Sequence, residues 1–203
     1  MENGRMENAV TLHGRVVYEP WLSHENHGER FWAFPLEVCR LSGTPDRLNV
    51  LVSHTVLESC PLASGDEVTV EGEVRSYNNR SGVGPKLVIT VLVRFAVPCP
   101  PSEGENRLIL SGVLCKTPVR RRTPLGREIC DLLLAVNRPY GRADYLPCIA
   151  WGSLAALCGS MDVGTPLHVE GRLQSRRYRK LTDAGEEERV AFEVSVMNLL
   201  SES

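Results

Sequence analysis

The chain has 203 residues, with 23 basic and 25 acidic side chains and a net charge of −2. It contains no run of 18 apolar residues, which excludes a membrane-spanning helix. If the net charge of −2 were spread evenly over the chain, it would also exclude a nucleic-acid-binding protein. The first eight residues have no apolar signal core, so we expect a cytoplasmic, nucleoid-associated protein.

The chain contains an internal repeat. At an offset of 98, residues 8–60 and 106–158 share 12 identities in 53 positions, including Arg40 with Arg138 and Asp46 with Asp144. Average composition would give roughly 3. The match continues at an offset of 99, where Ser76 meets Ser175. A period near 100 exceeds that of solenoid repeats and indicates a duplicated domain. We predict domains at 1–97 and 106–203, joined by the proline-containing linker 98–105.

Each copy has the pattern of five strands and one short helix. In the second copy, apolar residues alternate along 108–114, 130–136, 146–150, 167–173 and 190–196. The alanine- and leucine-rich segment 152–158 lies between the third and fourth strands and favours a helix. We therefore predict an all-β chain of two tandem five-stranded OB-fold barrels, each with a short helix between strands three and four.

No pattern in the chain indicates catalysis, a metal or a cofactor. The seven cysteines are at least ten residues apart and lack metal or redox spacing, so we interpret most of them as core residues. The five histidines also lack ligand spacing. A phosphate-binding glycine loop, a nucleophile elbow and paired carboxylates are absent from the sequence. We predict a protein that is not an enzyme.

The charge is divided unevenly between the copies. Residues 1–105 hold 9 basic and 14 acidic side chains, and residues 106–203 hold 14 basic and 11 acidic ones. The net charges are −5 and +3. One basic cluster, within 116–127, lies in the connection between strands one and two. The other lies on strand four and its outgoing loop, within 172–180. These connections flank the oligonucleotide groove of OB-folds, where cations would neutralise phosphates. The alternative is a solvated hairpin.

Aromatic side chains accompany the second copy's cations. The alternation of strands three and four places Tyr145, Trp151 and Tyr178 on the outer face. Arg172, Gln174 and Arg176 share that face. Aromatic rings stack on any base, at about 1–3 kcal/mol each. The alternative is that Trp151 packs under the neighbouring helix or in a subunit interface.

Five ordered runs carry a family resemblance: 122–127, 134–138, 144–152, 171–180 and 192–196. Together they make the second copy similar to the bacterial single-stranded DNA-binding protein family. The resemblance implies base stacking on the three aromatics and, less directly, on Tyr140. With the basic clusters, the predicted single-stranded DNA (ssDNA) contacts are Arg120, Arg121, Arg122, Arg127, Arg138, Tyr140, Tyr145, Trp151, Arg172, Gln174, Arg176, Arg177, Tyr178 and Lys180. It also implies a homodimer with four OB-folds that acts in replication, recombination and repair.

The first copy departs from this pattern. Trp151 is matched by Ser53, Tyr145 by Arg47 and Arg172 by Glu73. Weaker contact candidates remain at Trp32, Arg75 and Tyr77. We expect this domain to bind DNA weakly and to serve assembly or partner contact. The family's acidic tail with a hydrophobic tip has no counterpart at 199–203, which puts recruitment of replication or repair proteins in doubt. One alternative is a primosomal accessory protein that works mainly through protein contacts. The other is a pure interaction module.

Overall fold

The computed structural model describes residues 7–80, 84–101, 104–182 and 185–200. The expectations about the two chain ends rest mainly on residues 1–6 and 201–203, which lie outside this part. The chain divides into two compact units, one within 9–75 and 89–107 and the other within 1–8, 76–88 and 108–203. The segment 76–88 thus groups with the second repeat, although it belongs to the first in sequence. The predicted domain boundaries stay predictions.

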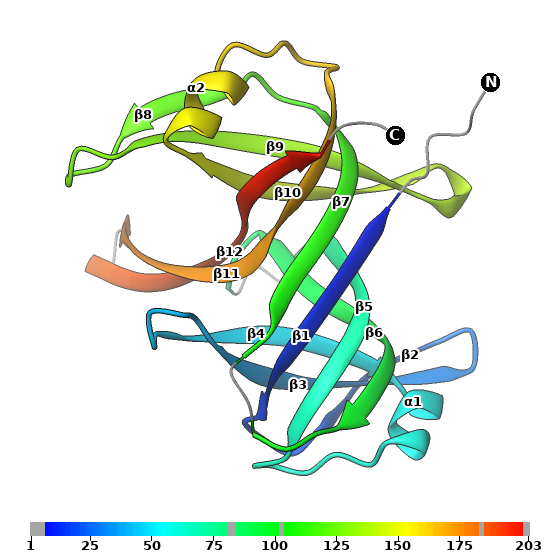
Figure 1. Ribbon diagram of the computed structural model, residues 1–203. Helices are drawn as coiled ribbons and strands as arrows, with labels where there is room; N and C mark the ends of the chain where they lie inside the picture. Colours follow the sequence, from blue (N-terminus) through cyan, green and yellow to red (C-terminus); the bar gives the residue numbers. More distant parts are fainter. Residues whose placement is uncertain (1–6, 81–83, 102–103, 183–184, 201–203) are drawn as a thin grey trace. The chain divides into compact units, whose positions relative to one another are not determined.

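The first repeat forms one barrel of antiparallel strands with a single parallel pair, β4 with β6. Its strand order is β2-β3-β4-β6-β5-β1, and β1 also pairs with β3, which closes the barrel. The short helix lies against β3 and β4 (Figure 1). The elements are β1 (Asn8–Val16), β2 (Trp21–Asn26), β3 (Glu29–Cys39), β4 (Pro45–Ser53), α1 (His54–Ser59), β5 (Glu67–Asn78) and β6 (Leu87–Pro98).

The second repeat has the same topology. Its order is β7-β11-β12-β10-β9-β8, β7 closes on β9, and β10 and β12 form the parallel pair. The elements are β7 (Asn106–Leu114), β8 (Val119–Arg122), β9 (Glu128–Arg138), the 3-10 turn η1 (Pro139–Gly141), β10 (Arg142–Trp151), α2 (Ser153–Cys158), β11 (Pro166–Thr182) and β12 (Gly185–Leu200). The predicted all-β OB-fold architecture, with a helix between the third and fourth main strands, is confirmed.

The predicted alternation sets the two cores. Leu134, Leu146 and Leu173 are fully buried in the second barrel, and Phe34 and Leu48 in the first. Each such side chain contributes about 1.5–3 kcal/mol through burial. Four of the seven cysteines are buried, as interpreted from the sequence: Cys60, Cys130, Cys148 and Cys158. Burial raises the pKa of the Cys158 thiol to about 11 and that of Cys148 further still, so both stay neutral.

Glycine lets the backbone of β11 approach β12 closely. At Gly171, beside a register shift in the β11–β12 pairing, a Cβ atom would lie 2.5 Å from the carbonyl oxygen of Ser195. The matched Gly72 meets the carbonyl oxygen of Leu92 in the same way. Both repeats therefore need a residue without a side chain where the barrel wall bends.

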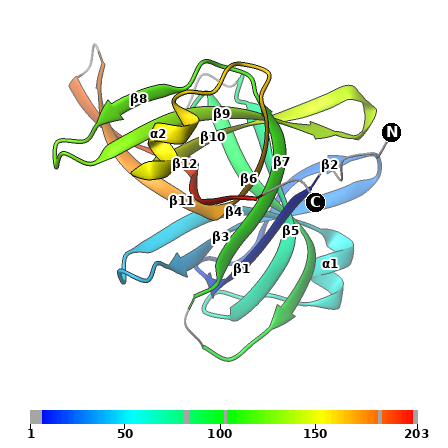
Figure 2. The same ribbon diagram turned by 45° about the horizontal axis from the view of Figure 1, so that its top comes forward.

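Two features differ from the prediction. The basic run between the first two main strands contains a sixth strand, β8, paired with β9, instead of a loop alone. The outer half of β11 and β12 is a two-stranded ribbon, because β7 pairs with β11 only up to Gly171 and β10 reaches β12 only near Val194 (Figure 2). Both features extend the cationic segments away from the barrel core.

Candidate nucleic-acid interface

A single cross-strand row brings a cation and an indole together. Arg121 on β8 and Trp151 on β10 are both register partners of Ile129 on β9. Opposite residues of neighbouring strands lie on the same face of a sheet, so the three side chains form one row. Ile129 is buried, whereas Trp151 is 36% exposed. Trp151 is therefore partly accessible at the surface, and its role as a base-stacking residue stays a prediction.

The three consecutive arginines of β8 divide between two faces, because strand residues alternate. Arg121 points to the Trp151 side and makes two hydrogen bonds to Asp131, the longer of them 3.1 Å. This contact raises the pKa of Arg121 above its ordinary value. Arg120 and Arg122 share Glu128, at 3.7 and 3.3 Å. The three arginines and Glu128 line a shallow hollow of about 220 Å³.

Arg127 lies at the end of the turn that joins β8 to β9. Its N–H donates to the hydroxyl of Thr123 at 3.1 Å, and Gly126 takes a positive φ in the turn. The turn therefore fixes the backbone of Arg127 beside the β8 arginines, and its side chain is exposed.

The β11–β12 ribbon carries further cations, and two of them, Arg176 and Arg177, pair with carboxylates of β12. Arg176 lies 3.3 Å from Glu193, and its guanidinium stands 5.6 Å from the centre of the Tyr178 ring. Arg177 pairs with Glu188 at 3.5 Å. Arg172 and Gln174 lie further in and are half-buried. The side chain of Lys180 is outside the part of the chain that the structure describes. The exposed Arg177–Glu188 pair contributes about 0–1 kcal/mol, so a phosphate can displace Glu188 at small cost, whereas Glu193 is buried and keeps Arg176 more firmly.

The hairpin between β9 and β10 presents the other aromatics. Tyr145 on β10 is 49% exposed, and Tyr140 in the turn is fully exposed with φ +64°. Gly141 also has a positive φ, so two consecutive residues adopt the left-handed region. Tyr140 therefore stands out from the turn without contact to the barrel.

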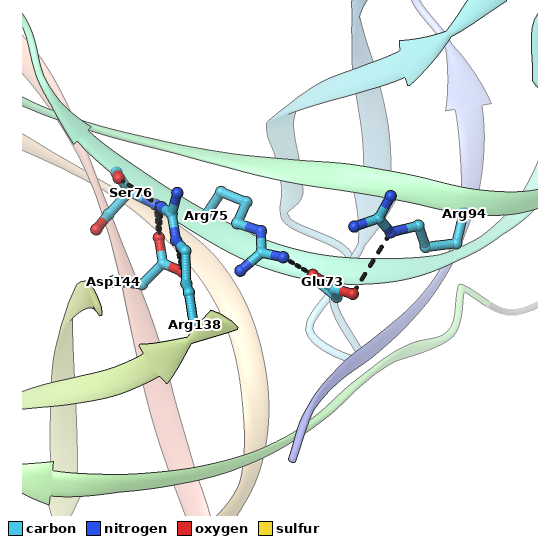
Figure 3. A network of polar contacts seen from close by, with 6 residues as sticks. All are labelled: Glu73, Arg75, Ser76, Arg94, Arg138 and Asp144. Atoms are coloured by element: carbon cyan, nitrogen blue, oxygen red, sulfur yellow. Dashed lines mark hydrogen bonds and ion pairs between the residues drawn. The ribbon is translucent and has the colours of Figure 1, made fainter. Parts of the chain in front are cut away.

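Arg138 has a different place from the one predicted. It forms an ion pair with Asp144, whose carboxylate is completely buried, and donates to the carbonyl oxygen of Ser76 at 2.9 Å (Figure 3). A buried carboxylate needs such a partner, and an arginine held this way is not available to a phosphate. We therefore leave Arg138 out of the proposed contacts.

The equivalent row of the first repeat contains neither an arginine nor a tryptophan. Because β2 carries a register shift between Leu22 and His24, the row there is His24, Phe31 and Ser53. The rings of His24 and Phe31 stack 5.0 Å apart. A histidine and a serine thus replace the arginine and the tryptophan. The rest of β2 is exposed and includes Trp21 and Leu22.

The weaker candidates of the first repeat have separate environments. Trp32 stacks on His54 of α1, with ring centres 6.3 Å apart and its Nε1 atom buried. Arg75 pairs with Glu73, which also contacts Arg94 at 3.4 Å (Figure 3). Tyr77 is exposed near the end of β5. A joint DNA contact by these three residues stays a prediction.

Some residues that shape this interface carried no signal in the sequence. Asp131 and Glu193 hold Arg121 and Arg176, and neither is near its partner in sequence. The Arg138–Asp144 pair did have a signal, because Arg40 and Asp46 match it in the repeat. That first pair is also formed, with two hydrogen bonds of 2.7 Å.

In the described residues, no group of three metal-ligating side chains occurs, and no helix is long and apolar enough to cross a bilayer. The fold and this surface define a tandem OB-fold protein with one basic, aromatic barrel. Residues 105–200 match the Single-strand binding protein family. Through this repeat the chain is similar to the bacterial single-stranded DNA-binding proteins.

Curated relatives and solved structures agree with this assignment. Single-stranded DNA-binding protein 3 of Listeria innocua is 36% identical over 80 residues, which are 36% of this chain and 50% of the relative. Single-stranded DNA-binding protein A of Bacillus subtilis is also 36% identical over 80 residues, 46% of its length. The chain thus spans about half the length of the curated relatives it matches. The wild-type Thermus aquaticus single-stranded DNA binding protein superposes with a TM-score of 0.79 at 25% identity, over 98% of this chain and 94% of that one.

Proposed function

We propose that the chain binds ssDNA through its second repeat, with little preference for sequence. The row of Arg121, Ile129 and Trp151 carries the proposal, because it joins a phosphate-binding cation to a base-stacking ring within the segment that matches the family. The other aromatics and arginines of the repeat extend this contact. Stacking does not read base edges, so coating of any exposed strand follows.

This activity has the character of coating, not catalysis. The curated relatives and the Thermus aquaticus neighbour are named single-stranded DNA-binding proteins. We propose the corresponding roles for this chain in replication, recombination and repair. The contact set for these roles is Arg120, Arg121, Arg122, Arg127, Tyr140, Tyr145, Trp151, Arg172, Gln174, Arg176, Arg177, Tyr178 and Lys180.

The first repeat has a different part in the proposal. Its row of His24, Phe31 and Ser53 supplies neither arginine nor indole, and its half of the sequence has a net charge of −5. We propose that it binds ssDNA weakly and serves assembly in a homodimer with four OB-folds. Light scattering tests this assembly: a mass twice that of the chain supports it, and a monomer at all concentrations contradicts it.

A titration with oligo-dT tests the function. We expect Trp151→Ala to weaken binding by about 1–3 kcal/mol, or roughly 5- to 150-fold, because one stacking platform is lost. Trp21→Ala is the matched control, since it removes an exposed tryptophan from the first repeat. Equal losses in both variants would contradict the asymmetry between repeats. No measurable oligo-dT binding by the parent chain would contradict the function itself.

The alternative is a primosomal accessory role that depends on protein contacts. The exposed Trp21 and Leu22 on the edge strand β2 favour it, because such residues suit a protein interface. A pull-down with helicase-loading proteins separates the two functions. Retention after nuclease treatment supports the accessory role, and retention only with DNA present supports coating.

A further inference from the structure

The last three residues of β5, which begin at Ser76, contribute to the unit that holds the candidate interface. Residues 76–88 group with 108–203, although they come from the first repeat. Within this unit, Ser76 lies beside the turn end of the β9–β10 hairpin, next to Arg138 and Asp144 (Figure 3). Ser76 is buried, whereas Tyr77, which follows it, is exposed.

Ser76 makes three hydrogen bonds to the hairpin. Its N–H donates to the carboxylate of Asp144, and its carbonyl oxygen accepts from Arg138 at 2.9 Å. Its hydroxyl accepts from the backbone N–H of Tyr145 at 2.7 Å. Asp144 is completely buried, so each donor that it gains offsets part of its lost hydration. One residue therefore completes the Arg138–Asp144 pair and fixes the backbone of Tyr145.

The contact to Tyr145 fills a gap in the sheet. β10 has β9 on one side and β12 on the other. In the described residues, β12 pairs with β10 at Cys148 and Ile149 and does not reach Tyr145. Tyr145 lies three residues before them, close to a turn with two positive φ values. A backbone N–H that loses water without gaining a partner is destabilising, and the hydroxyl of Ser76 supplies that partner, so it holds this segment in one conformation.

The first repeat has the same Arg–Asp pair without the aromatic. Arg40 and Asp46 form it, but the residue that matches Tyr145 is Arg47, which contacts Glu37 at 3.2 Å. The pair is thus a general device of this hairpin. Only in the second repeat is the aspartate of this pair followed by an aromatic residue, Tyr145.

We propose that Ser76 is a positioning residue for base stacking on Tyr145, so that a residue of the first repeat completes the ssDNA site of the second. This inference rests on the proposed function. Base stacking needs the ring at a fixed height and tilt, and the backbone of Tyr145 sets both. A chain cut at residue 105 would separate Ser76 from the site, which makes the intact chain the proper material for the test.

The test is a double-mutant cycle in the intact chain, read by oligo-dT affinity. Ser76→Ala removes the acceptor of the Tyr145 N–H, and we expect about three- to tenfold weaker binding, the usual scale of one hydrogen bond. In the Tyr145→Ala background the same change should have no further effect. Ser76→Thr keeps the hydroxyl and should restore affinity. A merely structural role would weaken both backgrounds alike.

Ser160→Ala is the control, because its hydroxyl makes a local hydrogen bond to the carbonyl oxygen of Leu157 and should leave affinity unchanged. If Ser76→Ala does not fold, Ser76→Cys carries the test, since a thiol is a weak acceptor of similar size. Parental affinity in the Ser76 variant, or an equal loss in both backgrounds, overturns the inference. Trp151→Ala in the same assay separates the two proposals: if it also binds like the parent, the proposed function fails.

Discussion

Asp131→Asn tests whether Arg121 contacts phosphates. The two side chains are both roughly half exposed, at 44% and 42%, so their pair contributes about 0.2–1 kcal/mol. A phosphate that takes Arg121 must first break this pair. Without the carboxylate that cost disappears, and ssDNA affinity should rise by up to about fivefold.

The dependence of ssDNA affinity on salt concentration gives a second, independent test of the contact between Arg121 and a phosphate. When DNA binds to the parent chain, Arg121 exchanges the carboxylate of Asp131 for a phosphate, and this exchange offsets part of the dependence of affinity on salt. In Asp131→Asn this offset is absent. The slope of log affinity against log salt should therefore steepen by up to about 0.7, the value for one phosphate on a single strand.

The assay is oligo-dT titration at several salt concentrations, with Asp162→Asn as control. Asp162 is an exposed carboxylate in the loop between α2 and β11, so its loss changes net charge equally. If both variants bind equally well with the same slope, net charge alone explains the result. The assignment of Arg121 to a phosphate is then wrong.

Three further outcomes follow from the structure. A hydrogen bond from Arg15 and the contact with Arg47 lower the pKa of Glu37. Its stabilisation is thus present above about pH 4.3 and lost as the pH falls, so Glu37→Gln should lose less unfolding free energy in acid titration than the parent. In native alkylation followed by mass spectrometry, exposed Cys39 should react first and buried Cys148 and Cys158 last; early modification of either buried thiol would contradict its burial. Gly171→Ala should lower the melting temperature, because its Cβ meets a backbone carbonyl; an unchanged melting temperature would contradict the close approach.

The sequence predicted the barrels well because their cores follow a simple rule. Alternation along 130–136 and 146–150 placed Leu134 and Leu146 inside, and the repeat doubled the signal. The short helix at 153–158 followed from composition and spacing. Local patterns of this kind depend on residues close in sequence, so one chain contains them completely.

The site could be predicted only in part. Tyr145, Trp151 and Arg176 lie on the outer surface, as the alternation indicated. The pairing of Arg121 with Asp131 depends on the register of β8, a strand too short and too polar to show any period. For this reason the sequence pattern predicted a loop at 119–122, where the structure has the strand β8.

Arg138 shows the other limit. As one more arginine in a basic repeat, it was assigned to DNA, yet its guanidinium holds the buried Asp144 and the carbonyl oxygen of Ser76. Its matched partner Arg40 pairs with Asp46 in the acidic repeat. That recurrence in a repeat without the other cations was the available hint that this arginine has a structural task.

Fluorescence of Trp151 alone tests the central claim most directly. The chain has three tryptophans, so a Trp21→Phe/Trp32→Phe variant reports on Trp151 without interference. With oligo-dT we predict strong quenching of its emission, saturating with DNA and reversed by added salt, because a base stacks on the indole while arginines bind the flanking phosphates. DNA binding without any change in Trp151 emission, or quenching that salt does not reverse, would contradict the account.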